Sequence, residues 1–390
     1  MGDFPLSIIP LAIFALYFVL RDWRKRSAQT KPPSAGGQFK RYGYRVTLPE
    51  NFIPEKGSTV PADLRASLPE SGYFFVVPLF LPDWPSSAEA ISAGFLRCFD
   101  IALTDGNLRL EKTLRHASGF EGHEFSFLRT VDSVVYDFRL HVYHGKALAY
   151  LLAAISTKPE TKARIHGVLD TVEFEDAGRP ESFTESESHR HGEIYNNIGL
   201  YYFQNGDIHS SLNFFQSSTQ YQPTEPAFLS NYTIALERLE KGEAALAFLR
   251  ESLQASNMQI LPPDEEKRNA QIGPLNLSEV IEKRRAQLVP LWLRLAILEA
   301  RYGDRQKSLE MFTDAQERYP DLITDDAVVE HVRLLEVENQ KETAVSVAMG
   351  CIERTGSIPV LIALSELFRR DGAFEKSLEL LERRRNEFYF

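Results

Sequence analysis

The sequence predicts a multidomain chain with an N-terminal transmembrane helix, an α+β domain with an antiparallel sheet, and a C-terminal all-α solenoid of helical repeats. Three observations support this prediction. Residues 4–20 are apolar and uncharged, residues 39–176 alternate as β-strands do, and residues 192–390 carry a helical pattern that returns in the same frame. At 390 residues the chain exceeds the usual single domain, so we expect more than one folding unit.

Composition and charge narrow the class of function. The chain is 43% hydrophobic and 25% charged, which is ordinary for a globular protein. Its net charge of -10 argues against a nucleic-acid ligand, which would favour a basic face. Cys98 and Cys351 lie in different predicted domains and outside any CxxC pair. We therefore expect two buried thiols, with no zinc or redox motif.

The apolar segment 4–20 is short for a membrane span, since about 17 residues rise roughly 1.5 Å each. Basic residues and Trp23 follow it at once, and no basic region precedes it as in a secretory signal. We predict a single-pass membrane protein that contacts the lipid bilayer through residues 4–20. The N-terminus is expected outside and the bulk of the chain in the cytoplasm. The inverted topology and a buried soluble helix are the alternatives.

Two polar stretches predict linkers around the α+β domain. Residues 21–38 begin as a basic juxtamembrane segment and continue as a flexible tether rich in Pro and Gly. Residues 177–191 are acidic and serine-rich and lack apolar periodicity, which predicts a second linker. His189 and His191 in this stretch do not make a metal site, because two residues are too few.

Residues 39–176 are expected to form an antiparallel sheet with one early and one late helix. The apolar run 73–81 predicts a strand buried on both faces, and Pro78 within it indicates an edge or a bulge. Ser86 or Ser87 caps the early helix, and Lys158-Pro159 opens the late one. Further strands are predicted at 44–48, 108–116, 121–130, 134–143, 147–155 and 172–174.

The order of these elements carries a family resemblance. Together with the opening GYRVTLPENF and the final helix followed by VEFED, it resembles the Mog1/PsbP-like α/β/α sandwich. The resemblance covers about a third of the chain and rests on topology. It implies a domain that binds or assembles protein complexes and has no common catalytic set.

We find no motif for catalysis, cofactor binding or metal binding. GxSxG, Walker-type and GxGxxG patterns are absent, and His123-Glu124 lacks the second histidine of HExxH. The polar face of the strand 134–143 bears Asp137, Arg139 and His141. An enzyme is the alternative hypothesis, and its site would require this face to converge with Glu121 or Glu124 in a deep pocket.

Residues 193–223 predict two antiparallel helices that meet at Gly206-Asp207, and residues 292–320 repeat the pattern around Gly303-Asp304. In both copies an aromatic residue precedes the turn glycine by eleven residues, a Phe follows it by nine, and a Pro follows the Phe by eight. These landmarks are Tyr195, Phe215 and Pro223 in the first copy, and Trp292, Phe312 and Pro320 in the second.

This frame resembles the tetratricopeptide (TPR) family. Three weaker copies are predicted at about 229–252, 328–351 and 361–381, with Asn339 in place of the turn glycine in one of them. Residues 258–288 do not fit the frame, so we interpret them as an insertion. Its first part is expected to be a disordered loop rather than a functional one, and residues 277–288 a helix.

The resemblance implies a concave groove that binds a protein or peptide segment of a partner. Carried over to this chain, the groove residues are Asn196, Leu200, Gln204, Leu293, Ile297 and Arg301. Asn196 and Leu200 do not supply the carboxylate clamp of chaperone-binding TPR domains. The predicted function is a membrane-anchored, non-catalytic scaffold that recruits or assembles partner proteins. The alternatives are an enzyme that uses the repeats to recruit substrate, and a periplasmic assembly factor with inverted topology.

Overall fold

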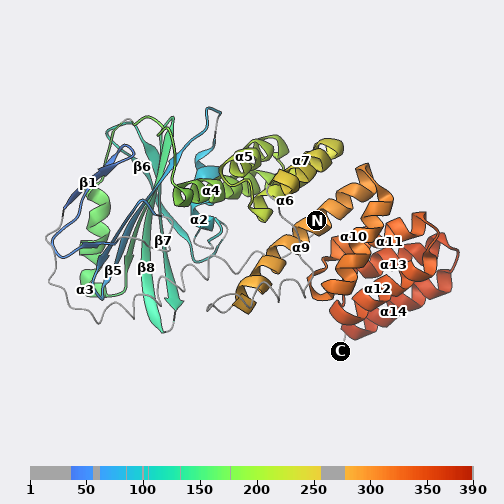
Figure 1. The fold of residues 1–390 in the computed structure, drawn as a ribbon. Coiled ribbons are helices and arrows are strands. Elements are labelled where there is room, and N and C mark those ends of the chain that lie inside the picture. The colour runs from blue at the N-terminus through green and yellow to red at the C-terminus, as the bar shows by residue number, and fades with distance from the viewer. Residues whose placement is uncertain are drawn as a thin grey trace. The chain divides into compact units, whose positions relative to one another are not determined.

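The computed structural model describes residues 37–55, 62–84, 86–98, 101–103, 105–131, 133–175, 177–255 and 277–388. The chain divides into two compact units, with the boundary between Gln222 and Pro223 (Figure 1). Among the described residues no helix is long and apolar enough to cross a bilayer. The predicted membrane segment 4–20 and most of the tether 21–38 lie outside the described residues.

Unit 1 is built on a seven-stranded antiparallel sheet of order β3-β4-β5-β9-β8-β7-β6. A three-stranded antiparallel sheet of order β1-β2-β10 packs beside it. The strands of the large sheet are β3 (Ile53–Pro54), β4 (Leu64–Leu68), β5 (Gly72–Phe80), β6 (Arg109–Arg115), β7 (Glu121–Val131), β8 (Val134–His144) and β9 (Leu148–Ser156). Those of the small sheet are β1 (Gln38–Arg41), β2 (Tyr44–Thr47) and β10 (Glu173–Phe174). The predicted antiparallel sheet is confirmed.

β5 is buried along its whole length, as its apolar run predicts. β9 pairs with every residue of β5 from Gly72 to Phe80, whereas the pairing of β4 with β5 ends at Val76. Pro78 therefore lies where β5 has a neighbouring strand on one side, so its missing N–H removes no hydrogen bond from the β4 side. The edge position predicted from Pro78 is confirmed for this end of the strand.

Both faces of the large sheet are covered. α2 (Ala88–Arg97) packs on one face, where Ile91 and Phe95 join Phe75 and Val77 in the core. As predicted, Ser87 caps this helix, and its Oγ accepts from the N–H of Ala90 at 3.1 Å. On the other face lie α3 (Pro159–His166), η1 (Gly167–Thr171) and the small sheet. The domain is thus layered on both sides of the sheet.

α4 (Glu185–Gln204) and α5 (Ile208–Tyr221) form the first helical hairpin, and it belongs to unit 1. Ile194, Ile198 and Phe214 share a core with α2 and the large sheet. The contact with α2 is close, since a Cβ on Gly94 would lie 2.4 Å from Ile198 Cγ1. The first repeat and the α+β domain are therefore packed as one compact body.

The linker predicted at 177–191 is corrected by this hairpin, because α4 begins at Glu185, within that stretch. Thr184 and Glu187 form a capping box: the Thr184 side chain accepts from the N–H of Glu187, and the Glu187 side chain accepts from the N–H of Thr184. His191 is fully buried, and its ring lies 4.6 Å from that of Phe183 and 5.3 Å from that of Tyr221. The T-x-x-E spacing was the signal for a helix start here.

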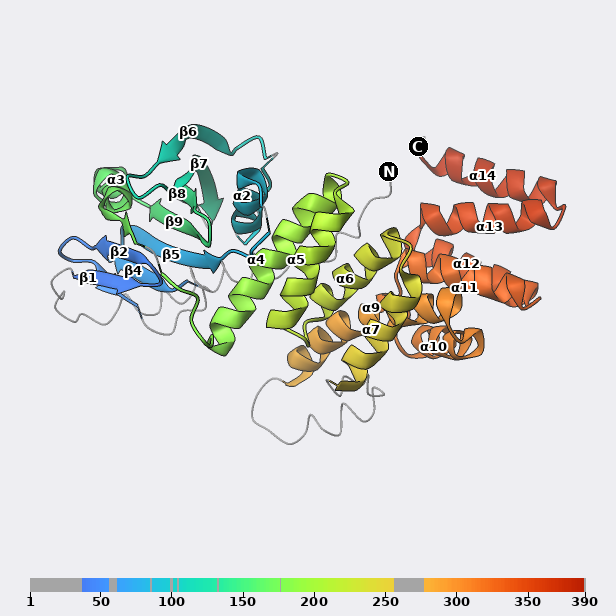
Figure 2. The ribbon, with the colours of Figure 1, turned by 90° about the horizontal axis from the view of Figure 1, so that it is seen from above.

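Unit 2 consists of four further hairpins among its described residues (Figure 2). The pairs are α6 (Pro226–Arg238) with α7 (Gly242–Ala255), α9 (Leu277–Tyr302) with α10 (Arg305–Arg318), α11 (Asp325–Val337) with α12 (Lys341–Thr355), and α13 (Ile358–Arg370) with α14 (Phe374–Phe388). Together with α4 and α5 they match the five predicted repeats.

The predicted insertion at 258–288 is corrected at its C-terminal end. The helix expected over 277–288 is present, but it continues through Pro290 into the first helix of the next repeat. The remainder of the insertion, 258–276, lies outside the described residues.

The turns of the hairpins explain the register of the repeats. Gly206, Glu240, Asn339 and Gly372 occupy equivalent places after a first helix, and all have positive φ, from 58° to 84°. Asn339 confirms the predicted left-handed turn residue. In the second repeat Glu240 takes this conformation, whereas Gly242 begins α7. Gly242 lies two residues later than the turn glycine of the first repeat would, but the backbone turn itself is at Glu240, the position equivalent to Gly206.

Candidate functional site

In the first repeat, one of the three predicted groove residues contacts the α+β domain of unit 1. Asn196 is buried, Leu200 is half-buried and Gln204 is exposed. The Gln204 side-chain oxygen accepts a hydrogen bond from Arg97 Nη2 of α2 at 2.8 Å. Tyr202, on the same helix, accepts through its hydroxyl from the N–H of Ser87 at 2.9 Å. Much of this side of α4 thus contacts the chain's own α2.

In the clear later repeat, two of the three predicted groove residues belong to the core. Leu293 is 1% exposed and Ile297 is 2% exposed, so neither presents a surface to a partner. α9 packs against α6, α7, α10 and α11, and this leaves little of its surface open. Arg301 is exposed, yet its guanidinium is bound to Glu237 of α6 at 3.2 Å and Glu330 of α11 at 2.6 Å.

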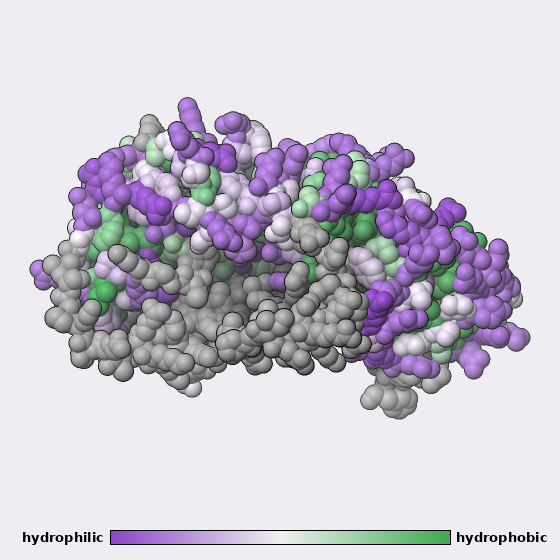
Figure 3. Space-filling model, viewed as in Figure 1, coloured by the Kyte–Doolittle hydropathy of each residue, from purple (hydrophilic) through white to green (hydrophobic). Residues whose placement is uncertain are grey.

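The equivalent groove positions carry exposed side chains on α11 and α13, which are the first helices of the last two hairpins. The predicted groove positions lie ten, six and two residues before the turn residue. In α11 and α13 the open side chains at these positions are Arg333, Val337, Ile362, Glu366 and Arg370. Val337 is 58% exposed and Ile362 is 49% exposed. Over these C-terminal helices, apolar patches interrupt the hydrophilic surface (Figure 3).

Ion pairs connect the first helices of successive hairpins in unit 2. Glu237 of α6 pairs with Arg294 and Arg301 of α9, and Glu336 of α11 pairs with Arg370 of α13 at 3.1 Å. In both cases a Glu three residues before one turn contacts an Arg two residues before the next turn. The inner face predicted to be apolar and amide-bearing is therefore strongly charged.

Glu299 is a second charged centre, and its side chain is fully buried on α9. Its carboxylate accepts hydrogen bonds from Arg250 Nε at 2.8 Å, Lys307 Nζ at 3.0 Å and the N–H of Asp304 at 3.1 Å. Burial opposes its ionisation, but these donors prevail and lower the pKa of Glu299 to about 2. This carboxylate connects α7, α9 and α10.

Acid should destabilise both units through buried carboxylates. Burial raises the pKa of Glu187, but hydrogen bonds from Tyr42 and Thr184 and the charge of Arg41 lower it to about 2, as for Glu299. Their stabilisation is complete above the unfolded-state pKa of about 4.3 and is lost as the pH falls toward 2. We expect urea unfolding between pH 6 and pH 2.5 to show this loss. Glu187→Gln and Glu299→Gln should flatten the profile of their own units, and an unchanged profile would contradict the assignment.

Two residues of the polar face of β8, Arg139 and His141, converge on Glu124. Glu124 is 3% exposed. Its carboxylate lies 2.8 Å from Arg139 Nε, 3.1 Å from His141 Nε2 and 3.3 Å from Lys112 Nζ. Register explains the cluster, because Glu124 of β7 lies directly opposite His141 of β8. Glu121 pairs instead with Arg115, at 3.6 Å.

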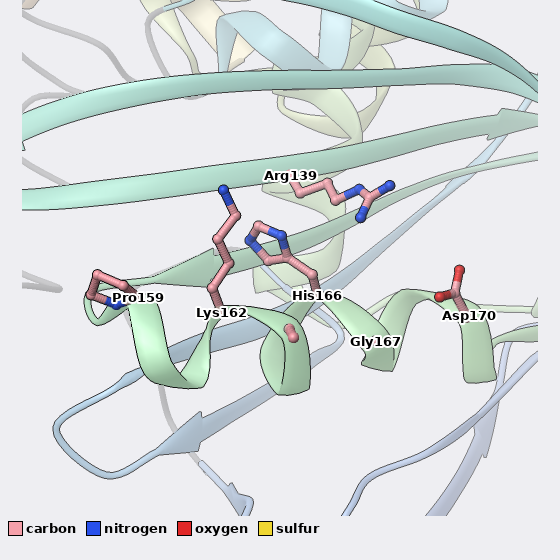
Figure 4. A pocket seen from close by; sticks show the side chains of 7 residues that line it. Arg139, Pro159, Lys162, His166, Gly167 and Asp170 are labelled. Carbon is pink, nitrogen blue, oxygen red and sulfur yellow. The ribbon is translucent and has the colours of Figure 1, made fainter.

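A pocket of about 400 Å³ lies beside this cluster, between β8 and the helical segment α3–η1 (Figure 4). Its polar lining residues are Arg139, Lys162, His166 and Asp170. Lys162 Nζ lies 2.5 Å from Asp137, and His166 Nε2 lies 3.7 Å from the same carboxylate. In Figure 4 the side chains of Lys162 and His166 rise from α3 toward the strand that carries Arg139.

The charged side chains in this pocket and in the neighbouring Glu124 cluster form ion pairs with one another. The hydrogen bond and charge of Arg139 outweigh burial and keep the pKa of Glu124 below its usual range, so this carboxylate is ionised and held by three side chains. Burial lowers the pKa of His141 to about 4 and also lowers that of His166, so both rings are neutral at pH 7. His166 is the titratable ring that lines the pocket.

Among the described residues, no group of three or more His, Cys, Asp or Glu side chains is arranged to hold a metal ion. Cys98 and Cys351 are free thiols, the first half-buried and the second buried.

Comparisons with known proteins bear on the helical repeats. No protein-family model matches the sequence, and no curated protein matches it. The structure is similar to residues 41 to the end of MamA from Desulfovibrio magneticus RS-1, with 13% identity, a TM-score of 0.35, and coverage of 50% of this chain and 93% of that chain.

Two other solved structures are similar over the same share of the chain. TTC0263, described as a thermophilic TPR protein of Thermus thermophilus, is 11% identical, with a TM-score of 0.37 and coverage of 50% of this chain and 89% of that chain. YrrB, described as a TPR protein with an unusual peptide-binding site, is 14% identical, with a TM-score of 0.31 and coverage of 49% and 83%. We base the description of the repeats as TPR-like on the hairpins and turns of this chain itself.

Proposed function

We propose that the chain is a non-catalytic scaffold that binds a helical segment of a partner protein through the first helices of its C-terminal repeats. The observation that carries the proposal is that the side chains at the groove positions of α11 and α13 are exposed. There Val337 and Ile362 expose apolar surface beside the charged Arg333, Glu366 and Arg370. An amphipathic helix with an apolar stripe and flanking charges matches this combination.

The first repeat has a different role in this proposal. Because α4 contacts α2 of the α+β domain, it joins that domain to the chain instead of receiving the partner. The binding surface therefore moves from Asn196, Leu200, Gln204, Leu293 and Ile297 to the C-terminal repeats. Arg301 contributes through its ion pairs, which hold α6, α9 and α11 in register.

The test is site-specific cross-linking in cells. A photoreactive residue at Arg333, which is 53% exposed, should cross-link a discrete partner protein. Val337→Asp with Ile362→Asp should remove that product without changing the unfolding midpoint, because both side chains are exposed. Leu110→Asp, at a 60% exposed leucine of β6, is the matched control and should leave the product intact. The proposal is wrong if the product survives the double substitution or is lost in the control.

Membrane anchoring through residues 4–20, with the N-terminus outside and the bulk of the chain in the cytoplasm, is part of the proposal. It rests on the apolar segment and the basic residues that follow it. A reporter that is active only outside the cytoplasm, fused to Phe390, should stay silent. Activity of the reporter would favour the inverted topology and a periplasmic assembly factor.

An enzyme with its site in the α+β domain is the second candidate. The observation that favours it is the pocket in which His166 lies 3.7 Å from Asp137, beside the Glu124 cluster. A neutral histidine next to a carboxylate is a feasible general base. Its carboxylates are nevertheless engaged by Lys112, Arg139 and Lys162, which suits a structural network better.

A further inference from the structure

In unit 2, the second helix of a hairpin contacts the next hairpin through one stripe of residues. The stripe consists of the residues two, six and nine positions after the turn residue. In α7 these include Gly242 and Leu246. A Cβ on Gly242 would lie 2.1 Å from the ring of Tyr302, and Leu246 closely approaches Gly303 of the same following hairpin.

The following hairpins use the same positions. Phe312, nine residues after Gly303, stacks on the ring of His331 in α11 with 5.0 Å between ring centroids. Lys341, two residues after Asn339, forms an ion pair with Asp371 at the turn of the last hairpin. The stripe on the second helix is therefore the established surface between successive hairpins.

On the last hairpin, no described residue covers this stripe. Phe374, Leu378 and Leu381 follow Gly372 by two, six and nine residues and are 65%, 58% and 41% exposed. The equivalent Leu246 and Leu309, which a following hairpin covers, are 4% and 7% exposed. α14 is the last of the successive helices of unit 2 in Figure 2.

The sequence of α14 indicates what covers the stripe, which we call the C-terminal stripe and define as Phe374, Leu378 and Leu381. The apolar spacing of four and three residues is that of a helix-to-helix seam, and Phe388 continues it in sequence. Charge divides along the same helix. Glu375, Lys376, Glu379 and Glu382 give its earlier part a net negative charge, and Arg383, Arg384, Arg385 and Glu387 give its later part a net positive charge.

We propose that the C-terminal stripe binds the same stripe of a second copy of this chain, with the two α14 helices antiparallel. An antiparallel pair with two-fold symmetry places the acidic half of each helix beside the basic half of the other. The surface is self-complementary, which favours a second copy over an unrelated helix. This dimer leaves the first helices α11 and α13 to a partner protein, so it goes beyond the proposed scaffold function.

The first test is sedimentation equilibrium of the full-length chain in a density-matched detergent. The wild type should dimerise in a concentration-dependent manner. Leu378→Glu should raise the dissociation constant of the dimer about tenfold or more, with an unchanged unfolding midpoint because the side chain is exposed. Leu128→Glu, at a 63% exposed leucine of β7, is the matched control and should dimerise as the wild type does. A wild-type monomer at all concentrations, or a dimer unaffected by Leu378→Glu, overturns the proposal.

The second test exchanges charge. Glu375→Arg with Glu379→Arg makes the earlier part of α14 net basic like the later part, and Arg383→Glu with Arg384→Glu and Arg385→Glu makes the later part net acidic like the earlier part. Each variant alone should remain monomeric because like charges meet in the antiparallel pair, whereas an equimolar mixture should form heterodimers. A mixture that stays monomeric, or variants that dimerise alone, contradicts the antiparallel arrangement.

Discussion

Replacing Ile198 with Ala should lower the stability of the α+β domain as a whole, by about 2–5 kcal/mol. Ile198 is on α4, in the first helical repeat, and its side chain is fully buried in a core shared with α2 and the large sheet. The cavity left by the truncation would open between the repeat and the sheet domain. If these parts unfold together, a substitution in the repeat destabilises strands that precede it by more than a hundred residues.

Hydrogen exchange in increasing urea distinguishes the two parts of the chain. For Ile198→Ala, protection should fall together in α2, α4 and β5, and α12 of unit 2 should be unaffected. Leu364→Ala is the matched control, since Leu364 holds the equivalent position of α13 and is also fully buried. It should lower protection in α13 and α14 and leave β5 unchanged. Loss of protection confined to α4 and α5 would show that the repeat folds independently of the sheet.

The elements of the fold were predictable from local patterns. Alternation from Val134 to Tyr143 predicted β8, because one face of that strand is apolar and the other polar. The hairpins were predictable because the turn residue, the close-packed small residues and the apolar stripe recur at fixed spacing. Gly199 shows why that spacing is restricted, since a Cβ there would lie 2.6 Å from the Phe215 ring. Such constraints lie within one hairpin and are visible in one sequence.

The candidate site was less predictable, because exposure depends on segments that lie far apart in the chain. The register of a TPR-like groove selected Ile297 by spacing, yet α9 packs against four other helices and this side chain is buried. Gln204 has a partner 107 residues earlier, Arg97, and no local pattern predicts that contact. The polarity of residues 185–191 hid a helix start that its Thr184–Glu187 spacing could have predicted. Long-range packing decides which predicted surface stays open.

Removing the carboxylate of Glu237 should destabilise unit 2 by about 3–5 kcal/mol, since it would leave a buried cation without its counter-ion. Arg294 is 8% exposed, and its guanidinium forms an ion pair with Glu237 while Nε donates to Thr233 at 3.2 Å. Burial lowers the pKa of Arg294, so its charge is already disfavoured. Glu237→Ala removes the interaction that compensates this cost.

The comparison with a surface ion pair isolates the effect of burial. Asp314 and Arg318 of α10 form a pair at 2.7 Å with 31% and 41% of their side chains exposed. Asp314→Ala should cost only about 0–1 kcal/mol, because water solvates the remaining cation. Urea unfolding monitored by the fluorescence of Trp292, in a background where Trp23 and Trp84 are replaced by Phe, measures both variants. Equal costs for Glu237→Ala and Asp314→Ala would mean that water reaches Arg294 in the variant.

Replacing both charges by apolar residues should recover most of the lost stability. In Glu237→Leu with Arg294→Met the buried charge is removed together with its counter-ion, so the desolvation cost disappears as well. The expected result is a double variant more stable than Glu237→Ala. Arg301 would then keep only its ion pair with Glu330. A double variant as unstable as the single one would show that the ion pair orders the hairpins through its hydrogen bonds rather than by neutralising Arg294.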